Sequence, residues 1–155
     1  MVHQFEEGAV LITSNQTAGR GQRGNSWESD PESNLTFSLL LKPTFLKPTD
    51  QFLLTIIISL AITDSLQHLQ PEIPFKIKWP NDILAHGKKI CGMLIENSLS
   101  NSTIQHSVIG MGININQQAF SISQAVSLSM LSHQQFNLNL VLNAVLENVE
   151  KRILE

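Results

Sequence analysis

The stretch from Phe75 to Asn116 limits the possible folds more than any other part of the chain. It holds four short strand-like segments, separated by the turn sequences "PND", "HGK" and "NSLSNST": Phe75–Trp79, Ile83–Ala85, Lys89–Glu96 and the segment "TIQHSVIGMGINI". Short turns join neighbouring antiparallel strands, whereas parallel strands need a long crossover. The stretch therefore predicts a run of hairpin strands.

Two further strand-like segments precede this run. Ala9–Thr13 and Leu35–Leu41 are apolar enough to be buried strands. A glycine-rich loop and the turn sequence "ESDPESN" lie between them. The segment from Gln117 to Gln135 is polar and irregular, and we predict no element there.

Two helices complete the pattern. The first is expected to begin at a capping residue, Thr49 or Asp50, and to end near Leu69, before two prolines. The second is expected to begin at about Leu138, because its apolar residues recur at helical spacing. The positions expected to be buried are Phe52, Ile56, Leu60 and Leu66 in the first helix and Val141, Val145, Val149 and Ile153 in the second.

The order of these elements predicts the fold class. Strand, strand, helix, hairpin strands and helix indicate an α+β domain with a mixed, largely antiparallel sheet flanked by helices. Regular alternation of strand and helix, which would indicate a parallel sheet, is not found. With 155 residues, of which 42% are apolar, residues 1–155 are expected to form a single domain.

Composition excludes several classes of protein. The net charge of -3 gives no basic surplus, so a nucleic-acid partner is not expected. The only cysteine, Cys91, cannot form an internal disulfide, which favours a reducing cytoplasm. The longest apolar run, Phe52–Ile62, is too short to span a membrane, so no membrane association is expected. The histidines are scattered without the spacing of zinc ligands.

The sequence "TAGRGQRGNSW", from Thr17 to Trp27, resembles two nucleotide-binding fingerprints and fits neither. A dinucleotide fingerprint must open a helix, but a turn-rich segment follows these glycines. A P-loop needs a lysine after its second glycine, and Asn25 stands there. Two interpretations remain. Glycine N–H groups and the guanidinium groups of Arg20 and Arg23 can hold an anion, or the loop is a solvated surface loop with its tryptophan packed on the sheet.

Two later stretches also carry polar groups in unusual settings. In "KWPNDILAHGKKICG", two adjacent lysines must face opposite sides of the sheet, and Gly92 leaves room for a ligand beside Lys89. Asp82 is either a turn carboxylate or a functional one. In "VIGMGININ", glycines inside a strand indicate a bulge or a close approach of the backbone to another group. Asn114 offers both an acceptor and donors, as a purine edge requires.

The three stretches "QTAGRGQRGNSW", "KWPNDILAHGKKICGMLIE" and "VIGMGININ", in this order, resemble the biotin protein ligases, also called biotin–[acetyl-CoA-carboxylase] ligases. The resemblance covers about Gly8 to Asn116. These enzymes are related to lipoate ligases and class II aminoacyl-tRNA synthetases, so the resemblance implies their catalytic fold. It also implies a cytoplasmic, ATP-binding ligase that carries out protein modification.

The resemblance implies a reaction in two steps. Biotin reacts with ATP and Mg²⁺ to give biotinyl-5′-AMP, and the biotinyl group is then transferred to a lysine of a biotin carboxyl carrier domain. The partners implied are therefore biotin, ATP and the carrier domain of a biotin-dependent carboxylase, with a homodimer left open. A lipoate or octanoate ligase, and a non-catalytic fragment that binds biotin, are the alternatives.

The family's functional residues can be carried over to matching positions. Lys89 and Arg20 are the implied catalytic residues, and Asp82 is placed near the metal ion. The implied biotin-binding residues are Gln16, Gly19, Arg20, Gly21, Gln22, Lys89, Gly92 and Gly110. The implied nucleotide-binding residues are Arg23, Trp27 and Asn114.

The sequence departs from the family pattern at three places. Gln22 stands where many relatives have arginine, which lowers the positive charge of the loop. The Ser-Thr-Asn motif that lies upstream in the family, and helps to bind biotin, has no match in this chain. The small C-terminal domain and an N-terminal helix-turn-helix also have no match, so a repressor role is not expected.

Overall fold

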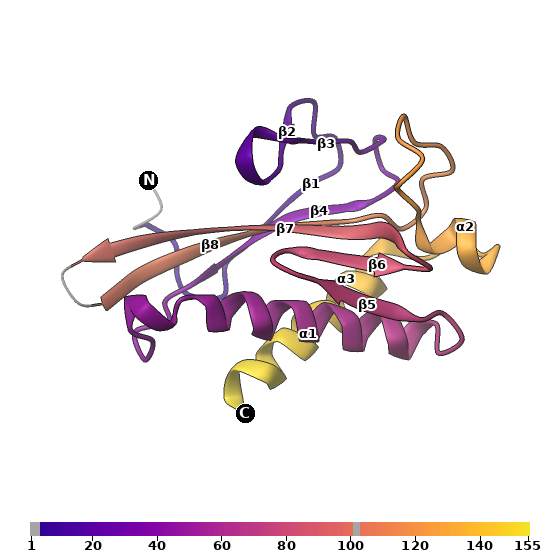
Figure 1. Ribbon diagram of the computed structural model, residues 1–155. Coiled ribbons are helices and arrows are strands. Elements are labelled where there is room, and N and C mark those ends of the chain that lie inside the picture. The colour runs from indigo at the N-terminus through magenta and orange to yellow at the C-terminus, as the bar shows by residue number, and fades with distance from the viewer. Residues whose placement is uncertain (1–3, 101–102) are drawn as a thin grey trace.

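A six-stranded antiparallel sheet organises residues 4–100 and 103–155, which are the residues that the computed structural model describes (Figure 1). The strands, in spatial order, are β1 (Val10–Thr13), β4 (Leu35–Leu41), β8 (Thr103–Ile113), β7 (Lys88–Ser100), β6 (Asp82–Ala85) and β5 (Phe75–Lys78). Every neighbouring pair runs antiparallel. The predicted run of hairpin strands and the α+β fold class are therefore confirmed.

The hairpin of β6 and β7 shows why the sequence determines this part of the fold well. His86 and Gly87 connect the two strands, and both have positive φ angles, of 49° and 78°. A two-residue hairpin loop with both residues in this conformation matches the twist of the strands. The predicted strands Ile83–Ala85 and Lys89–Glu96 are confirmed, and β7 continues to Ser100.

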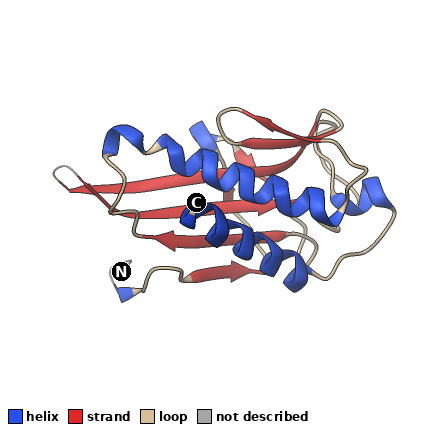
Figure 2. Cartoon of the chain, turned by 90° about the horizontal axis from the view of Figure 1, so that it is seen from below, coloured by secondary structure: helices blue, strands red, loops and turns tan. Residues whose placement is uncertain are grey.

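Two long helices cover one face of the sheet (Figure 2). They are α1 (Phe52–Leu69), which follows a 3-10 turn at Pro48–Asp50, and α3 (Leu138–Leu154). Asn137 caps α3, because its Oδ1 accepts hydrogen bonds from the backbone N–H groups of the first turn. The core lies between these helices and the sheet, and its helical residues include Leu54, Ile58, Ile62 and Leu66 of α1 and Val141, Val145 and Val149 of α3.

The structure corrects the prediction of which side of α1 is buried. Phe52 and Ile56, expected to be buried, are 40% and 42% exposed, and Leu60 is half-buried. Leu66 is buried as expected. The buried side was mispredicted because α1 is apolar on nearly all sides, so periodicity does not identify the buried face.

The start of α1 also differs from the prediction. Thr49 and Asp50 lie inside the 3-10 turn, and Gln51 occupies the N-cap position without a side-chain hydrogen bond. The whole segment Pro48–Leu69 is 22 residues long and is apolar enough to cross a membrane by length and composition. The run Phe52–Ile62, on which the sequence-based expectation rested, is therefore only part of the apolar helix. One side of α1 packs against the sheet, as in the core helix of a soluble protein.

The glycine-rich loop and the first part of the segment after β8 lie on the opposite face of the sheet from α1 and α3 (Figure 1). The loop contains two short paired strands, β2 (Gly19–Arg20) and β3 (Ser26–Trp27), with a 3-10 turn between them. The segment after β8 contains a short helix, α2 (Leu128–Ser132). The loop is thus placed above the sheet surface that the helices leave uncovered.

Polar contacts, rather than an apolar pattern, order the segment that the sequence left unassigned. Asn34 is buried, donates from Nδ2 to Gln117 Oε1 at 2.6 Å and accepts at Oδ1 from the Ile115 N–H at 2.9 Å. Ser127 donates to the Gln117 carbonyl at 2.6 Å and caps α2 by accepting from the Met130 N–H at 3.2 Å. Such side-chain contacts leave no periodic signal in the sequence.

Candidate functional site

A cavity of about 510 Å³ lies between the glycine-rich loop and the sheet. Its floor includes one row of residues that face each other across five neighbouring strands: Thr13, Thr36, Gly112, Gly92 and Asp82. Facing residues of antiparallel strands project to the same side of a sheet. The floor is therefore built from small and polar residues, with two glycines at its centre.

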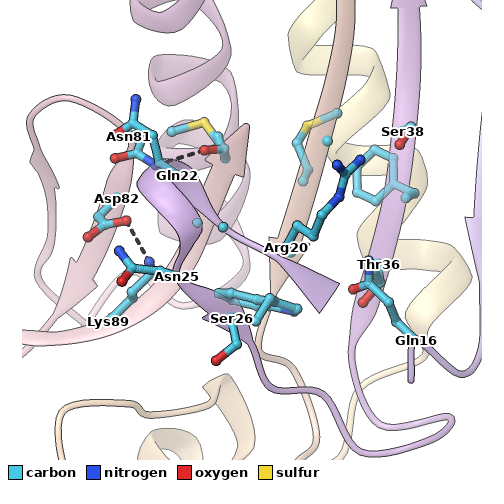
Figure 3. Close-up of a pocket in the computed structure, with 18 of the residues that line it drawn as sticks. Gln16, Arg20, Gln22, Asn25, Ser26, Thr36, Ser38, Asn81, Asp82 and Lys89 are labelled. Carbon is cyan, nitrogen blue, oxygen red and sulfur yellow. Dashed lines mark hydrogen bonds and ion pairs between the residues drawn. The ribbon is translucent and has the colours of Figure 1, made fainter. Parts of the chain in front are cut away.

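Lys89 and Asp82 form an ion pair at one side of this cavity (Figure 3). Lys89 Nζ lies 2.7 Å from Asp82 Oδ1, and the two side chains are 34% and 17% exposed. Lys78 Nζ lies 3.8 Å from the other carboxylate oxygen on a side chain that is 62% exposed. The carboxylate therefore keeps the Lys89 ammonium at the cavity through an ion pair, without a hydrogen bond of good geometry at Asp82 Oδ1 from any described residue.

The backbone of Lys89 is held as firmly as its side chain. Its N–H donates to the Gln124 carbonyl at 2.7 Å, and its carbonyl accepts from the Val126 N–H at 3.0 Å. The segment after β8 thus runs alongside the start of β7. This contact prevents Lys89 from fraying away from the cavity at the end of its strand.

The glycine-rich loop forms the roof of the cavity. Arg20, Gly21 and Gln22 line it together with Trp27. Figure 3 places the Arg20 side chain towards Thr36 and Ser38, across the cavity from Lys89. The loop leads into β3 and not into a long helix, which agrees with the rejection of both nucleotide fingerprints.

The structure brings most of the predicted site residues together. The predicted residues that line the cavity are Gln16, Arg20, Gly21, Gln22, Trp27, Asp82, Lys89, Gly92 and Gly110. Gly19 does not line it. Gly19 faces Trp27 in the β2–β3 pair, where an added Cβ would lie 2.5 Å from the Trp27 carbonyl oxygen. The side chain of Arg23 lies outside the described part of the structure, so its role stays a prediction.

Asn114 is 2% exposed and does not line the cavity. Its Nδ2 donates to the Val126 carbonyl at 3.1 Å and approaches the Lys89 carbonyl at 3.5 Å. Its Oδ1 is buried and has no hydrogen-bond partner among the described residues. Asn114 therefore supports the Lys89 backbone here, and its contact with a nucleotide stays a prediction.

The floor residues that sequence reasoning missed include Thr13, Thr36, Ser38 and Gly112. Thr36 and Ser38 alternate with apolar residues in β4, so the period-two pattern of "LTFSL" contained a signal for them. Gly112 was noted only as a strand glycine. Its position beside Gly92 follows from the pairing of β7 with β8.

The structure gives Asp82 no companion for a metal ion. Within residues 4–100 and 103–155, no group of three or more histidine, cysteine, aspartate or glutamate residues could hold one. The Asp82 carboxylate is already held by Lys89. Asp82 as a metal contact stays a prediction, and we derive no reaction step through a metal ion.

Cys91 is expected to be inert in the folded chain. It is fully buried, and burial raises the pKa of its thiol, while nearby Lys89 lowers it and Asp82 raises it. The thiolate, which is the reactive form, is therefore not populated at pH 8. Iodoacetamide should leave Cys91 unmodified in the native chain and modify it in urea, as mass spectrometry would show. Rapid modification of the native chain would contradict this.

Comparison with known sequences identifies relatives of this chain. The model of the biotin/lipoate A/B protein ligase family matches residues 2–114. The bifunctional ligase/repressor BirA of Bacillus spizizenii is 35% identical over 152 residues, covering 94% of this chain and 46% of that protein. A biotin–[acetyl-CoA-carboxylase] ligase of Mycobacterium tuberculosis is 30% identical, covering 96% and 55%. The chain thus spans about half the length of the curated relatives it matches.

Solved structures that resemble this chain are also biotin protein ligases. The biotin protein ligase from Aquifex aeolicus in complex with biotin and ATP superposes with a TM-score of 0.83 at 31% identity, covering 96% of this chain and 62% of that chain. The biotin protein ligase from Leishmania major in complex with biotinyl-5-AMP has a TM-score of 0.76 at 24% identity, covering 92% and 63%, and shows a common fold.

Proposed function

The chain belongs to the biotin/lipoate A/B protein ligase family, and we propose that it activates biotin with ATP and transfers the biotinyl group to a protein lysine. The observation that carries this proposal is the Lys89 ammonium, which the Asp82 carboxylate fixes in a cavity that Arg20 also enters. Two cations facing one cavity suit a reaction between two anions. The name of the Mycobacterium tuberculosis relative and the complex of the Aquifex aeolicus enzyme with biotin and ATP support biotin and ATP as the two anions.

In the first step, a biotin carboxylate oxygen attacks the α-phosphorus of ATP, and the bond from that phosphorus to the pyrophosphate oxygen breaks. The products are biotinyl-5′-AMP and pyrophosphate. Both reactants are negatively charged, so fixed cations are needed to offset their repulsion in the transition state. We assign this role to Lys89 and Arg20. Mg²⁺ would enter with ATP and neutralise its phosphates.

In the second step, the neutral amine of the target lysine attacks the acyl carbon of the mixed anhydride. AMP leaves with the bonding electrons, and the amine loses a proton as the amide forms. Water is the competing nucleophile, so a roof over the intermediate favours transfer over hydrolysis. The glycine-rich loop is placed to form that roof. Gln22 brings no charge to it, so we expect weaker retention of the anionic adenylate than an arginine would give.

Gln16 supports biotin as the ligand through its position in the cavity. Its Oε1 is buried and has no hydrogen-bond partner among the described residues. A buried acceptor of this kind costs free energy unless a ligand donor reaches it, and the N–H groups of the biotin ring are such donors. Gly110 is proposed to lie against the same ligand, and Gly92 would do so only where the Trp27 indole has moved away from it.

We also propose the partner, the compartment and the extent of the catalytic unit. The name of the Mycobacterium tuberculosis relative supports the carrier domain of a biotin-dependent carboxylase as the acceptor. The single buried cysteine suits a reducing cytoplasm. Residues 1–155 are proposed to act as one catalytic domain, and a homodimer stays a prediction.

Incubation of the chain with biotin, MgATP and a carrier domain tests the proposed function. We expect mass spectrometry to detect biotinyl-5′-AMP and one biotinylated lysine, neither of which should form when ATP is omitted. Lipoate and octanoate serve as matched competitors. Acylation by lipoate alone would favour the lipoate ligase alternative. Calorimetric binding of biotin without an adenylate would instead identify a non-catalytic binding fragment.

A further inference from the structure

The centre of the cavity floor has no side chains. In the row of facing residues, Gly112 of β8 and Gly92 of β7 stand side by side, between Thr36 of β4 and Asp82 of β6. All four residues face the cavity. Two adjacent glycines therefore leave a gap in the floor that is one side chain deep. We refer to Gly92 and Gly112 together as the glycine seat.

The indole of Trp27 fills the glycine seat. A Cβ added at Gly112 would lie 2.4 Å from Trp27 Cε2, 2.5 Å from Cζ2 and 2.8 Å from Nε1. A Cβ added at Gly92 would lie 3.1 Å from Trp27 Cζ3 and 3.0 Å from the flexible end of Lys89. Carbon atoms at 2.4 Å collide, so Gly112 cannot carry any side chain while the indole keeps this position.

Gly110 shows that the close contact is specific to the seat. It lies on β8 two residues before Gly112, faces the same cavity and also lines it. A Cβ added at Gly110 would meet its nearest atom, the Leu94 carbonyl oxygen, at 3.5 Å, an ordinary van der Waals distance. Of the three strand glycines Gly92, Gly110 and Gly112 that line the cavity, only the two in the seat would bring a Cβ close to the indole of Trp27.

Packing, and not a hydrogen bond, holds the indole in place. Trp27 Nε1 is buried and has no hydrogen-bond partner among the described residues, and an unsatisfied buried donor is unfavourable. The favourable contacts are the fit over the two glycines and a cation–π contact, with Lys89 Nζ 5.6 Å from the ring centroid. The space left by the two glycines of the seat therefore determines where the Trp27 ring lies.

The position of the indole in turn fixes the glycine-rich loop. Trp27 belongs to β3, which pairs with β2 through Gly19. Because Gly19 is in close contact with the Trp27 backbone, the two short strands move together. Displacing the indole therefore displaces the roof of the cavity.

We propose that Gly112, together with Gly92, positions Trp27 and thereby holds the glycine-rich loop closed over Lys89. Gly112 acts through the indole, so it is a positioning residue. The inference rests on the contact geometry and goes beyond the proposed function. If the proposed function holds, the Trp27 indole would cover the Lys89 ammonium whenever it lies in the glycine seat and the loop is closed.

Fluorescence of Trp27 in the ligand-free chain tests this proposal. The chain has two tryptophans, so a Trp79→Phe background leaves Trp27 as the reporter. Gly112→Ala should shift the emission to longer wavelength and raise its quenching by acrylamide. Gly92→Ala should have a smaller effect, since the flexible Lys89 side chain can give way, and Gly110→Ala should have none. Equal spectra for Gly112→Ala and Gly110→Ala in folded chains would overturn the proposal.

Limited trypsin digestion measures closure of the loop directly. Cleavage after Arg20 and Arg23 should be faster in Gly112→Ala than in the parent, and unchanged in Gly110→Ala. A folded Gly112→Ala chain that is cleaved at the parent's rate would overturn the proposal. Neither readout uses biotin or ATP, so failure of the ligase assay and failure of this proposal are distinguishable.

A double variant covers the case in which Gly112→Ala does not fold. Trp27→Ala removes the atoms that the new methyl group would meet, so Gly112→Ala should cost less unfolding free energy in the Trp27→Ala background. Recovery of folding in the double variant supports the seat. An equal loss of stability in both backgrounds would mean that the methyl group collides elsewhere and would overturn it.

Discussion

Replacing Lys89 by alanine is expected to slow formation of biotinyl-5′-AMP by about 10²–10³-fold, the loss typical for removal of one preorganised anion-stabilising donor. The physical reason is that biotin and ATP are both anions, and Lys89 is the cation that the cavity floor fixes in place. Its Nζ lies 2.7 Å from Asp82 Oδ1, so it needs no reorganisation before the reaction. Release of pyrophosphate at saturating biotin and MgATP measures the rate.

Lys78→Ala is the matched control for this variant. Lys78 approaches the same carboxylate, at 3.8 Å, but its side chain is 62% exposed and does not line the cavity. Adenylate formation should stay near the parent rate, since an exposed charge is screened by solvent. Circular dichroism would confirm that both variants are folded. A Lys89→Ala chain that forms adenylate at the parent rate would remove Lys89 from the mechanism.

The part of the site that lies within one hairpin could be predicted from the sequence. Asp82, Lys89 and Gly92 are close in sequence, and the two-residue loop at His86 and Gly87 sets how their strands pair. The hairpin loop sets the pairing next to it, and a register shift between Ile83 and Leu84 then places Gly92 opposite Asp82, so that the carboxylate, the ammonium and the glycine share one cavity. Local turn chemistry is visible in the residue types, which is why this group was found.

The part of the site that depends on distant pairing could not be predicted in the same way. Gly112 becomes part of a seat only because β8 pairs with β7 in one register, and Thr36 joins the row only through the register of β4. The contact with Trp27 adds a further long-range element. Asn114 illustrates another limit, because the same amide can serve a ligand or, as here, a backbone carbonyl. Residue type does not distinguish these uses.

The same distinction applies to the fold: elements determined by their local sequence were predicted, and elements determined by contacts with distant residues were not. Leu35–Leu41 was predicted with its observed bounds, and α3 begins at the predicted Leu138. The polar segment that contains α2 was not predicted, because buried hydrogen bonds such as those of Asn34 order it. The buried face of α1 was mispredicted, since a helix that is apolar on all sides fits the sheet in more than one rotation.

Two isoleucine variants test the observed rotation of α1. Ile58 is fully buried against the sheet, whereas Ile56, two residues earlier, is 42% exposed. Ile58→Ala should lower the free energy of unfolding by about 2–5 kcal/mol, through lost burial and the cavity left behind. A domain is stable by only about 5–15 kcal/mol, so this loss would be a large share of the total.

Ile56→Ala is the matched control, because it makes the same change on the same helix. Its cost should stay near the range of surface substitutions, about 0.5 kcal/mol, and the better helix propensity of alanine offsets part of it. Urea denaturation of both variants gives the two free energies, provided that the slope of free energy against urea is unchanged. Equal losses, or a larger loss for Ile56→Ala, would place the core on the side of α1 that carries Phe52. In that case the helix would be rotated relative to the sheet described above.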